Sequence, residues 1–419
     1  MEYLHHSSIP ATKSELELFH IPPTQTAIES SYEIEVRPAS SLDSSRSYIF
    51  NIPPSDDFTD LSATMVYIKC CLKTSDGNDL TEENKIKPVK NFANAMFEQI
   101  DFFFGSVNIC PANNLYAYQA FLEDFLFKHP TKADAGMMYD DNHSAHETRV
   151  KQSKAFDLYF RLHVPLCQQN NLLLNAVPIS VKMIRGKDSF PVIRDTSDTT
   201  TQCKIVIQDI SLIFRRVKLF PDVHSGIIAG IENSPAKYFL TRNEVKNFTI
   251  PIGLSSVSIE NVFAGPLPRR LLIGFVSNSA FNGDISSDPF NFEDFKLNFL
   301  ASYVDGIQYP SIAYTPDFEK SLYMKEFVNL YRYFNQDEGV PQLKISYKDF
   351  KNSPLFAIDI SPDGTTGAES GFLSLVKRGS IRIDAKFKEA LTKSIHMIIF
   401  AQFDNLIQID RYRNVSLDY

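Results

Sequence analysis

The chain has 419 residues and a net charge of -8, and 43% of its residues are hydrophobic against 22% charged. This is the composition of an ordinary globular protein, and it excludes a chain that is mainly disordered, collagen-like or coiled coil. At ~150 residues per domain the length predicts two or three domains, and the negative charge favours protein partners over non-specific nucleic-acid binding.

Aromatic residues are abundant but of only two types. The chain contains 34 Phe, 18 Tyr and no Trp, so aromatics make up 12% of it. Such side chains suit the half-buried faces of pleated sheets. The composition therefore favours β structure.

The five cysteines form no recognisable set. Their number is odd, Cys70 and Cys71 are adjacent, and no Cys-x-x-Cys pair occurs, which indicates reduced thiols rather than a disulfide framework or a zinc site. Met1–Pro10 has no apolar core of a secretion signal, and apolar stretches such as His396–Ala401 are far shorter than the ~20 residues that cross a bilayer. We therefore expect a protein that is neither Sec-exported nor membrane-spanning.

The first 30 residues differ in character from the rest. They contain several prolines and many Ser and Thr residues, but only one short apolar cluster, formed by Leu16, Leu18 and Phe19. Such a segment cannot bury a core of its own, which predicts an extended arm over residues 1–30. The three apolar side chains are its candidate contacts with another subunit.

Short strand-like runs separated by turn residues follow the arm. The predicted strands are Ile34–Val36, Ser47–Ile52, Thr64–Leu72, Ile100–Phe104, Leu158–Val164, Ile179–Ile184 and Lys204–Leu219. Runs of this length and spacing indicate a β-sandwich or barrel. In the last run the alternation slips between Ile207 and Ile210, which predicts a β-bulge.

One pattern occurs twice in the chain. The apolar hairpin Gln99–Pro111 precedes an amphipathic stretch, Leu115–Phe127, and the hairpin Leu297–Pro310 precedes a second one, Leu322–Phe334. The glycines in the two turns are 201 positions apart. Repeats in solenoid proteins are ~20–50 residues long, so this recurrence predicts a duplicated domain.

Further strands follow the second helix, at Phe356–Ile360, Ser380–Phe387 and Ile395–Phe403. Each half then has strands, a hairpin, an inserted helix and more strands, which fits an eight-stranded jelly roll. The predicted fold is all-β, with two tandem eight-stranded jelly-roll barrels and short inserted helices. Its predicted parts are an N-terminal arm (1–30), a first jelly roll (31–220) and a second jelly roll (221–419).

Short clusters spread from the arm to the C-terminus carry a family resemblance. They are Ser14–Phe19 with Pro22–Thr26, Leu162–Pro165, Leu172–Asn175, Lys187–Phe190, Asp288–Phe292, Thr315–Phe318 and Ala401–Val415. In this order they resemble the double jelly-roll major capsid proteins of Polintons (Mavericks) and the related adintoviruses. The resemblance covers nearly the whole chain and both halves.

The resemblance implies a hexon-like structural protein without enzymatic activity or cofactors. Two jelly rolls would lie side by side in each chain, and three chains would form a pseudo-hexameric capsomer of an icosahedral virion capsid, encoded by a Polinton-like virus or transposon. The implied partners are the chain itself as a homotrimer, neighbouring capsomers, penton or minor capsid proteins, and packaged DNA only weakly. Loops such as Thr131–Lys154 and Asn278–Asn291 would meet neighbouring subunits or solvent.

Two acidic segments are candidate metal sites. His143 and His146 lie three residues apart in a segment that also contains two aspartates and a glutamate, but the order is not His-Glu-x-x-His and the neighbouring residues are polar, which favours a solvated loop. Asp76–Asp79 lacks the later ligands of a calcium-binding loop, which favours a hairpin turn. No metal site is predicted.

Catalytic and DNA-binding patterns are equally weak. Cys167 near His163 is the one local nucleophile–base pair, and His163 is better explained as a packed or interfacial residue.

The basic clusters are Arg215, Arg216 and Lys218; Arg269 and Arg270; and Lys377 and Arg378. Solvated charges at strand ends explain these clusters better than a DNA-facing surface does.

Two other functions remain open on the sequence. Jelly rolls also form carbohydrate-binding modules and lectins, although the absence of Trp argues against a sugar-stacking site. A cupin-type enzyme would need a set of metal-binding histidines in one barrel, for which only His143 and His146 are available.

Overall fold

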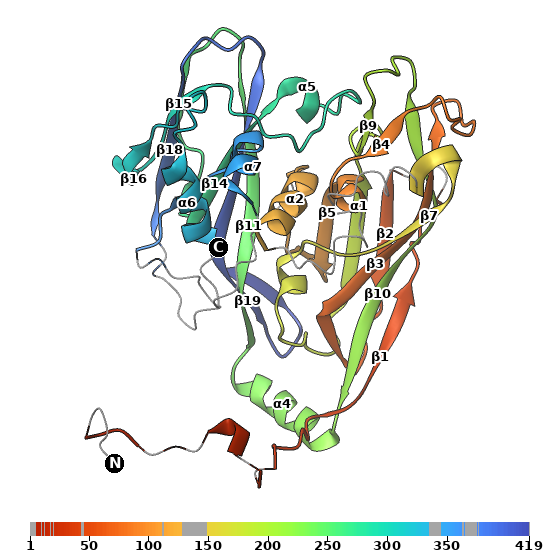
Figure 1. Ribbon diagram of the computed structural model, residues 1–419. Helices are drawn as coiled ribbons and strands as arrows, with labels where there is room; N and C mark the ends of the chain where they lie inside the picture. Colours follow the sequence, from red (N-terminus) through yellow and green to blue (C-terminus); the bar gives the residue numbers. More distant parts are fainter. Residues whose placement is uncertain are drawn as a thin grey trace.

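The computed structural model describes all residues except 1–5, 10, 12, 17, 20, 43–45, 111–112, 128–148, 335–344, 363, 365–374, 376 and 419. Its strands fall into two groups, one from each half of the chain (Figure 1). In the described residues no helix is long and apolar enough to cross a membrane.

The first half forms two facing four-stranded antiparallel sheets. Their strands are β1 (Ile28–Val36), β2 (Ser47–Ile52), β3 (Phe58–Thr74), β5 (Phe97–Phe104), β6 (Val107–Asn108), β7 (Phe156–Arg161), β8 (Ile179–Arg185) and β10 (Cys203–Leu219). The strand orders are β1-β10-β3-β7 and β2-β8-β5-β6. These eight strands form a jelly roll.

The second half repeats this arrangement. Its strands are β11 (Ala236–Ile250), β12 (Ser256–Ile259), β14 (Arg270–Ser277), β15 (Leu297–Val304), β16 (Ile307–Tyr314), β17 (Phe356–Asp359), β18 (Arg378–Phe387) and β19 (Ile395–Ile409). The strand orders are β11-β19-β14-β17 and β12-β18-β15-β16. Each strand therefore has a counterpart at the same place in the first half, and the prediction of two eight-stranded jelly rolls is confirmed.

Smaller elements complete the two halves. They are β4 (Ile86–Pro88), β9 (Val192–Arg194), β13 (Ala264–Pro266), β20 (Val415–Asp418), α1 (Phe92–Ala95), α2 (Tyr116–Phe127), α4 (Pro221–Asn233), α5 (Asn278–Phe281), α6 (Met324–Phe334), α7 (Tyr347–Asn352), and the 3₁₀ helices η1 (Ser14–Leu16), η3 (Lys151–Ser153) and η4 (Pro165–Gln168). Helices α2 and α6 form where amphipathic stretches were predicted, each between a short hairpin and the next strand.

The two hairpins agree with the duplication. β5 runs from Phe97 and β15 from Leu297, and both pair with the strand that follows a two-residue turn. Asp305 and Gly306 in the second turn have φ of 48° and 86°, and Gly105 in the first has φ of 58°. Positive φ in such turns matches the right-handed twist of the paired strands.

The alternation along the strands explains which faces are buried. In β2, Tyr48, Phe50 and Ile52 are buried, whereas Ile49 between them is exposed, as expected for a sheet with one face on a core. In β10 the register with β3 shifts between Ile207 and Asp209, which confirms the predicted bulge. β14 is buried along its whole length, so both faces of its sheet are covered.

A helix that the sequence analysis did not predict separates the two halves. Helix α4 begins at Pro221, which suits the first turn of a helix because proline lacks an N–H that would otherwise go unpaired there. It lies at the base of the molecule, where β10 ends and β11 begins (Figure 1). The proposed boundary at residue 220 thus coincides with the start of a connecting helix.

Candidate functional site

Helix α2 lies between the two jelly rolls, and we call this helix the wedge. It is apolar nearly all round, which is typical of a helix with no solvent-facing side. Tyr116 and Ala120 belong to the core of the first half. The residues of α2 and its approach that join the core of the second half are Leu115, Ala117, Tyr118, Phe121, Leu122, Phe125 and Leu126. A helix that belongs to the first half thus fills the core of the second (Figure 1).

Aromatic stacking fixes this wedge against the second half. The ring of Phe121 lies parallel to that of Phe290, with 4.3 Å between centroids. The hydroxyl of Tyr118 donates a hydrogen bond to the carbonyl of Pro289 at 3.0 Å. Stacked aromatic pairs add ~0.5–1.5 kcal/mol to the free energy gained from their buried area.

The segment after α5 returns to the first half. The hydroxyl of Ser189 donates to the carbonyl of Gly283 at 2.6 Å, and the backbone N–H of Arg194 donates to the carbonyl of Ile285 at 2.7 Å. Ile285 is buried in the core of the first half. The expectation that Asn278–Asn291 meets neighbours or solvent is therefore wrong for its apolar residues, which serve contacts within the chain.

A charged group of three side chains lies at the edge of the wedge. Nδ1 of His163 is 2.7 Å from a carboxylate oxygen of Glu123, and its Nε2 is 2.9 Å from one of Asp124. The two acids come from α2, and His163 comes from the loop between β7 and η4. Glu123 is almost fully buried. His163 is indeed a packed residue, as predicted.

Amides from both halves complete this network. The side chain of Asn243, on β11, donates to Glu123 at 2.7 Å, and that of Gln119 donates to it at 2.9 Å. Gln402, on β19, donates to Asn243 at 3.2 Å. A buried carboxylate needs such partners, because an unpaired one costs several kcal/mol. The network therefore joins α2 to the sheet of the second half with directional bonds.

The pKa values in this group follow from its geometry. Burial alone lowers the pKa of His163, but the charge and hydrogen bond of Asp124, followed by those of Glu123, outweigh burial and raise it from 6.5 to about 10. Burial raises the pKa of Glu123, but the hydrogen bond and charge of His163, with bonds from Gln119 and Asn243, hold it below 4.5. The group therefore contains an imidazolium between two carboxylates at neutral pH.

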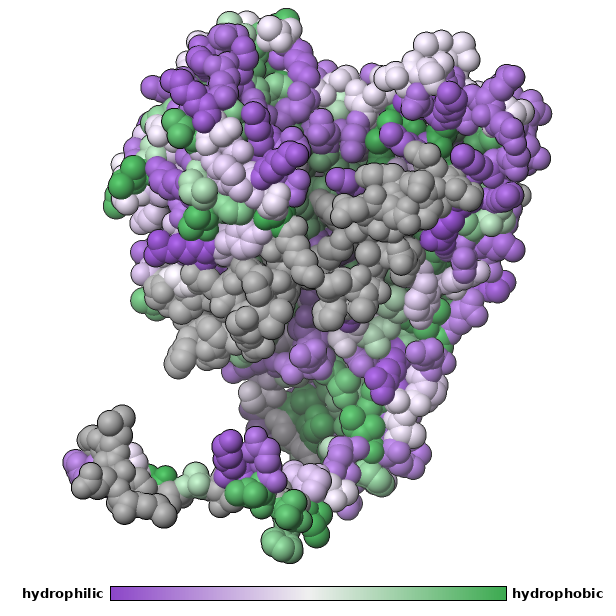
Figure 2. Space-filling model, viewed as in Figure 1, coloured by the Kyte–Doolittle hydropathy of each residue, from purple (hydrophilic) through white to green (hydrophobic). Residues whose placement is uncertain are grey.

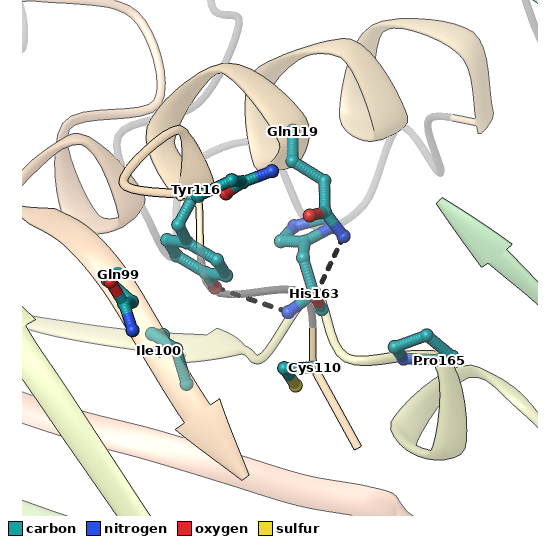
Figure 3. Close-up of a pocket in the computed structure, with 8 residues that line it drawn as sticks. Gln99, Ile100, Cys110, Tyr116, Gln119, His163 and Pro165 are labelled. Atoms are coloured by element: carbon teal, nitrogen blue, oxygen red, sulfur yellow. Dashed lines mark hydrogen bonds between the residues drawn. The ribbon is translucent and has the colours of Figure 1, made fainter. Parts of the chain in front are cut away.

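The space beside this group is too small for a substrate. Figure 3 shows Tyr116 and Gln119 on either side of the His163 backbone, whose N–H donates to the Tyr116 hydroxyl at 3.2 Å and whose carbonyl accepts from Gln119 at 3.3 Å. The cavity here measures about 10 Å³, which is the space of one water molecule. We interpret the group as a structural link between the halves.

Cys167 lies in the same region but has no base. Burial raises the pKa of its thiol to about 12, so the reactive thiolate is disfavoured. Both ring nitrogens of His163 are engaged by carboxylates. The geometry does not support a Cys167–His163 nucleophilic pair.

One of the two candidate metal sites falls on residues that the structure does not describe. Asp140, Asp141, His143, His146 and Glu147 lie outside the described residues. Within the part of the chain that the structure describes, no group of three or more His, Cys, Asp and Glu side chains could hold a metal ion.

The segment Asp76–Asp79 is a hairpin turn, as predicted. Gly77 has φ of 88°, and its N–H donates to the carbonyl of Thr74. Asp79 forms an ion pair with Lys73 at 3.2 Å. The carboxylate of Asp79 is therefore paired with Lys73 of the same chain.

Three of the arginines in the basic clusters are buried, which corrects the prediction of solvated charges for them. Arg216 donates to the hydroxyl of Thr59 and the carbonyl of Pro53. Arg269 forms an ion pair with Asp404 at 2.9 Å. Arg270 is also buried, with its guanidinium near the ring of Phe334. These charges serve the fold and are not accessible to DNA.

The remaining basic residues lie at the surface. Arg215 is 3.6 Å from Asp60, and Lys218 is 3.1 Å from Glu29. Lys377 and Arg378 are exposed, as predicted. Exposed ion pairs of this kind contribute little to stability, and they leave the first of these clusters partly neutralised.

The apolar side chains of the arm are exposed in the part of the chain that the structure describes. Leu16, Leu18 and Phe19 are 65%, 78% and 95% exposed. Figure 2 shows the arm projecting away from the base of the molecule. An exposed cluster on a projecting segment suits a contact with another chain, and its role as an inter-subunit contact stays a prediction.

The sequence analysis missed the buried group at the wedge. A signal was present, because Glu123 and Asp124 interrupt an otherwise apolar helix without a Lys or Arg within the helix. Charged residues are rarely buried unless they are paired. The partners, however, come from His163 and Asn243, which lie 40 and 120 positions away from Glu123.

Comparison with known proteins supports the fold. No family model matches the chain. An uncharacterized protein of Caenorhabditis elegans is 22% identical over 391 residues, which cover 88% of both chains. A chain of the Sputnik virophage superposes on 100% of this chain and 94% of its own with a TM-score of 0.61 at 12% identity.

Two further solved structures show the same similarity. A chain of the PBCV-1 virus capsid covers 96% of this chain and 99% of its own, with a TM-score of 0.63 at 10% identity. The mavirus major capsid protein covers 100% and 97%, with a TM-score of 0.58 at 11% identity. This chain has the double jelly-roll fold. The match over both halves does not favour the alternative of a jelly-roll carbohydrate-binding module or lectin.

Proposed function

We propose that this chain is a major capsid protein that assembles as a homotrimer into pseudo-hexameric capsomers of an icosahedral shell. The observation that carries the proposal is the pair of jelly rolls with identical strand order, locked side by side by α2 and its buried charged group. Three such chains around a closed three-fold axis present six similar lobes. The fold match to the mavirus major capsid protein over the whole chain supports this function.

We further propose a Polinton-like virus or transposon as its origin. The clusters from Ser14–Phe19 to Ala401–Val415 support this finer assignment through their resemblance to Polinton and adintovirus capsid proteins. The parts of the chain would be an arm (1–30), a first jelly roll (31–220) and a second (221–419). The location would be the virion, with neighbouring capsomers and penton or minor capsid proteins as further partners.

The proposal includes a structural role without catalysis. The buried group at His163 supports it, because its cavity admits no substrate and its charges are mutually paired. Contacts with packaged DNA would be weak, since Arg216, Arg269 and Arg270 are buried.

Solution mass tests the oligomeric state directly. We expect light scattering coupled to size-exclusion chromatography to give the mass of three chains of 47.6 kDa each. Negative-stain images of that peak should show a pseudo-hexagonal tile. A monomer that binds glycans on an array would contradict the capsid function and support the carbohydrate-binding alternative.

Deletion of the arm tests its role. We expect removal of residues 1–24, which ends before β1 and its bonds to β10, to reduce particle yield strongly while the melting temperature changes little, because Leu16, Leu18 and Phe19 are exposed. Leu16→Ser with Phe19→Ser is the matched point variant, and it should reproduce the loss. Unchanged particle yield in both variants would show that the arm is not an assembly contact.

A further inference from the structure

Helix α6 is the counterpart of α2, but one of its sides is not covered by the part of the chain that the structure describes. Each helix follows the short hairpin of its half, after β6 or β16, and precedes β7 or β17. Both sides of α2 are buried, one in each jelly roll. Leu330 and Phe334 of α6 are buried in its own half, whereas Met324 and Val328, on another side of the helix, are 55% and 50% exposed.

The exposed side of α6 continues onto the neighbouring strand. The ammonium of Lys325 donates to the carbonyl of Ala313 at 2.6 Å and contacts that of Ile312 at 3.3 Å, which places the end of β16 beside the helix. Ile312 is 74% exposed and Leu322 is 63% exposed. We call Ile312, Leu322, Met324 and Val328 the α6 patch. Several exposed apolar side chains on neighbouring elements are typical of interaction surfaces.

The surface that α2 occupies within the chain identifies the partner surface. α2 lies against β11, since Asn243 bonds to Glu123, and the side chain of Asn113, just before the helix, donates to the carbonyl of Val245 at 2.9 Å. β11 is the first strand of its sheet, and β1 is the strand at the same place in the first half. β1 is the surface that would receive α6 if the contact were repeated.

β1 has the properties of a partner surface. It is an edge strand that pairs with β10 and with no other strand in the described residues, and most of its residues are exposed, including Tyr32 at 47%. A bare edge of this length is usually covered or protected in a stable assembly. Glu33 on β1 is exposed, and so are Lys325 and Arg332 on the outer side of α6. A carboxylate of β1 can therefore face a cation of α6 across the contact.

We propose that the α6 patch docks on the β1 edge of the first jelly roll of a second copy, and so repeats between chains the contact that α2 makes on β11 within one chain. Figure 1 shows α6 and β1 on opposite sides of the molecule, so a single chain cannot make this contact. The contact is head-to-tail, because α6 of one chain meets β1 of the next. Three such contacts, one between each pair of neighbouring chains, close a ring of three chains. The inference rests on the proposed trimer and assigns its interface.

Glutamate substitutions test the patch. We expect Met324→Glu with Val328→Glu to abolish the trimer at concentrations where the wild type is fully trimeric, because two charges would be buried at the interface. The melting temperature of the resulting monomer should match that of a monomeric wild-type reference at high dilution. Ile252→Glu with Leu254→Glu changes a comparably exposed apolar pair elsewhere in the second half and should leave the trimer intact.

Cysteine cross-linking tests the pairing of surfaces without a destabilising change. We expect a mixture of Val328→Cys chains and Ser31→Cys chains to be joined by a short bis-maleimide, whereas either variant alone should not be. Four of the five native cysteines are buried, and Cys110 is half-buried. Unmodified wild type therefore provides the background.

The outcomes separate this inference from the proposed function. A trimeric wild type with a trimeric Met324→Glu, Val328→Glu variant would overturn the α6–β1 contact and leave the capsid function standing. Cross-linking of Val328→Cys chains to one another would overturn it as well, because it would place two α6 helices together. A monomeric wild type would contradict the proposed function itself.

Discussion

Replacing His163 by glutamine is expected to destabilise the protein by ~3–5 kcal/mol near neutral pH, because removing one partner of a buried ion pair leaves the other charges uncompensated. Glu123 and Asp124 would then lie about as close together as before without the imidazolium between them. Glutamine keeps a hydrogen-bonding amide, so the variant removes charge more than volume. Urea unfolding at one fixed protein concentration measures the difference.

The pH dependence of this loss has a defined sign. The pKa of His163 is raised from 6.5 to about 10 on folding, so below pH 6.5 both states hold the proton and the stabilisation is complete. As the pH rises from 6.5 to 10, the unfolded chain releases the proton while the folded protein keeps it, and stability falls. The pKa of Glu123 is lowered from 4.5, so its contribution is lost as the pH falls below that value. The difference in the free energy of unfolding between wild type and His163→Gln should therefore be largest between pH 4.5 and 6.5.

His396 provides the matched control. It is buried, stacks on the ring of Phe281 and bonds to Asn278, and has no carboxylate partner among the residues that the structure describes; burial lowers its pKa below 6.5. Its contribution is present above pH 6.5 and lost as the pH falls, which is the opposite trend. The difference in the free energy of unfolding between wild type and His396→Gln should therefore become smaller as the pH falls below 6.5. A gap for His163→Gln that widens toward pH 10 would contradict the ion-pair interpretation.

Truncating Phe121 to alanine is the second change with a large expected effect, a loss of ~3–5 kcal/mol. The ring stacks on Phe290 at 4.3 Å and is buried between the two jelly rolls. Because the lost contacts join the halves, we expect the single melting transition of the wild type to split into two. Differential scanning calorimetry measures both the loss of stability and the number of melting transitions.

Phe214→Ala is the control for this variant. Phe214 is fully buried on β10 in the core of the first half, so it loses comparable apolar contact without touching the second half. It should lower the melting temperature and keep the transitions together. A split transition in Phe214→Ala, or none in Phe121→Ala, would show that α2 does not couple the halves.

Local patterns were sufficient for the elements whose contacts lie nearby. The hairpins at Gly105 and Gly306, the helices after them and the bulge after Ile207 all appear where the residue pattern predicted them. Turn residues and hydrophobic alternation act within a few residues. The duplication was detectable because it preserved these local signals.

Other elements could not be predicted from local patterns. β14 was missed because both faces of its sheet are covered, so its residues do not alternate between polar and apolar. β11 was missed because the exposed Phe239 lies between the buried Tyr238 and Leu240, so its apolar residues do not alternate along the strand. The boundary helix α4 was missed because only Ile231 is buried in it. The solvent exposure expected for Arg216 and Arg269 was wrong because their partners come from distant strands.

The sequence by itself determined two similar all-β halves, a projecting arm and the absence of a recognisable catalytic motif, since these follow from composition, spacing and short-range periodicity. Only the tertiary structure decided that α2 belongs to both cores, that Glu123 pairs with His163 and Asn243, and that α6 keeps a side free. Such contacts join residues far apart in the chain, and their register depends on how two complete sheets pack, which no local window of residues specifies.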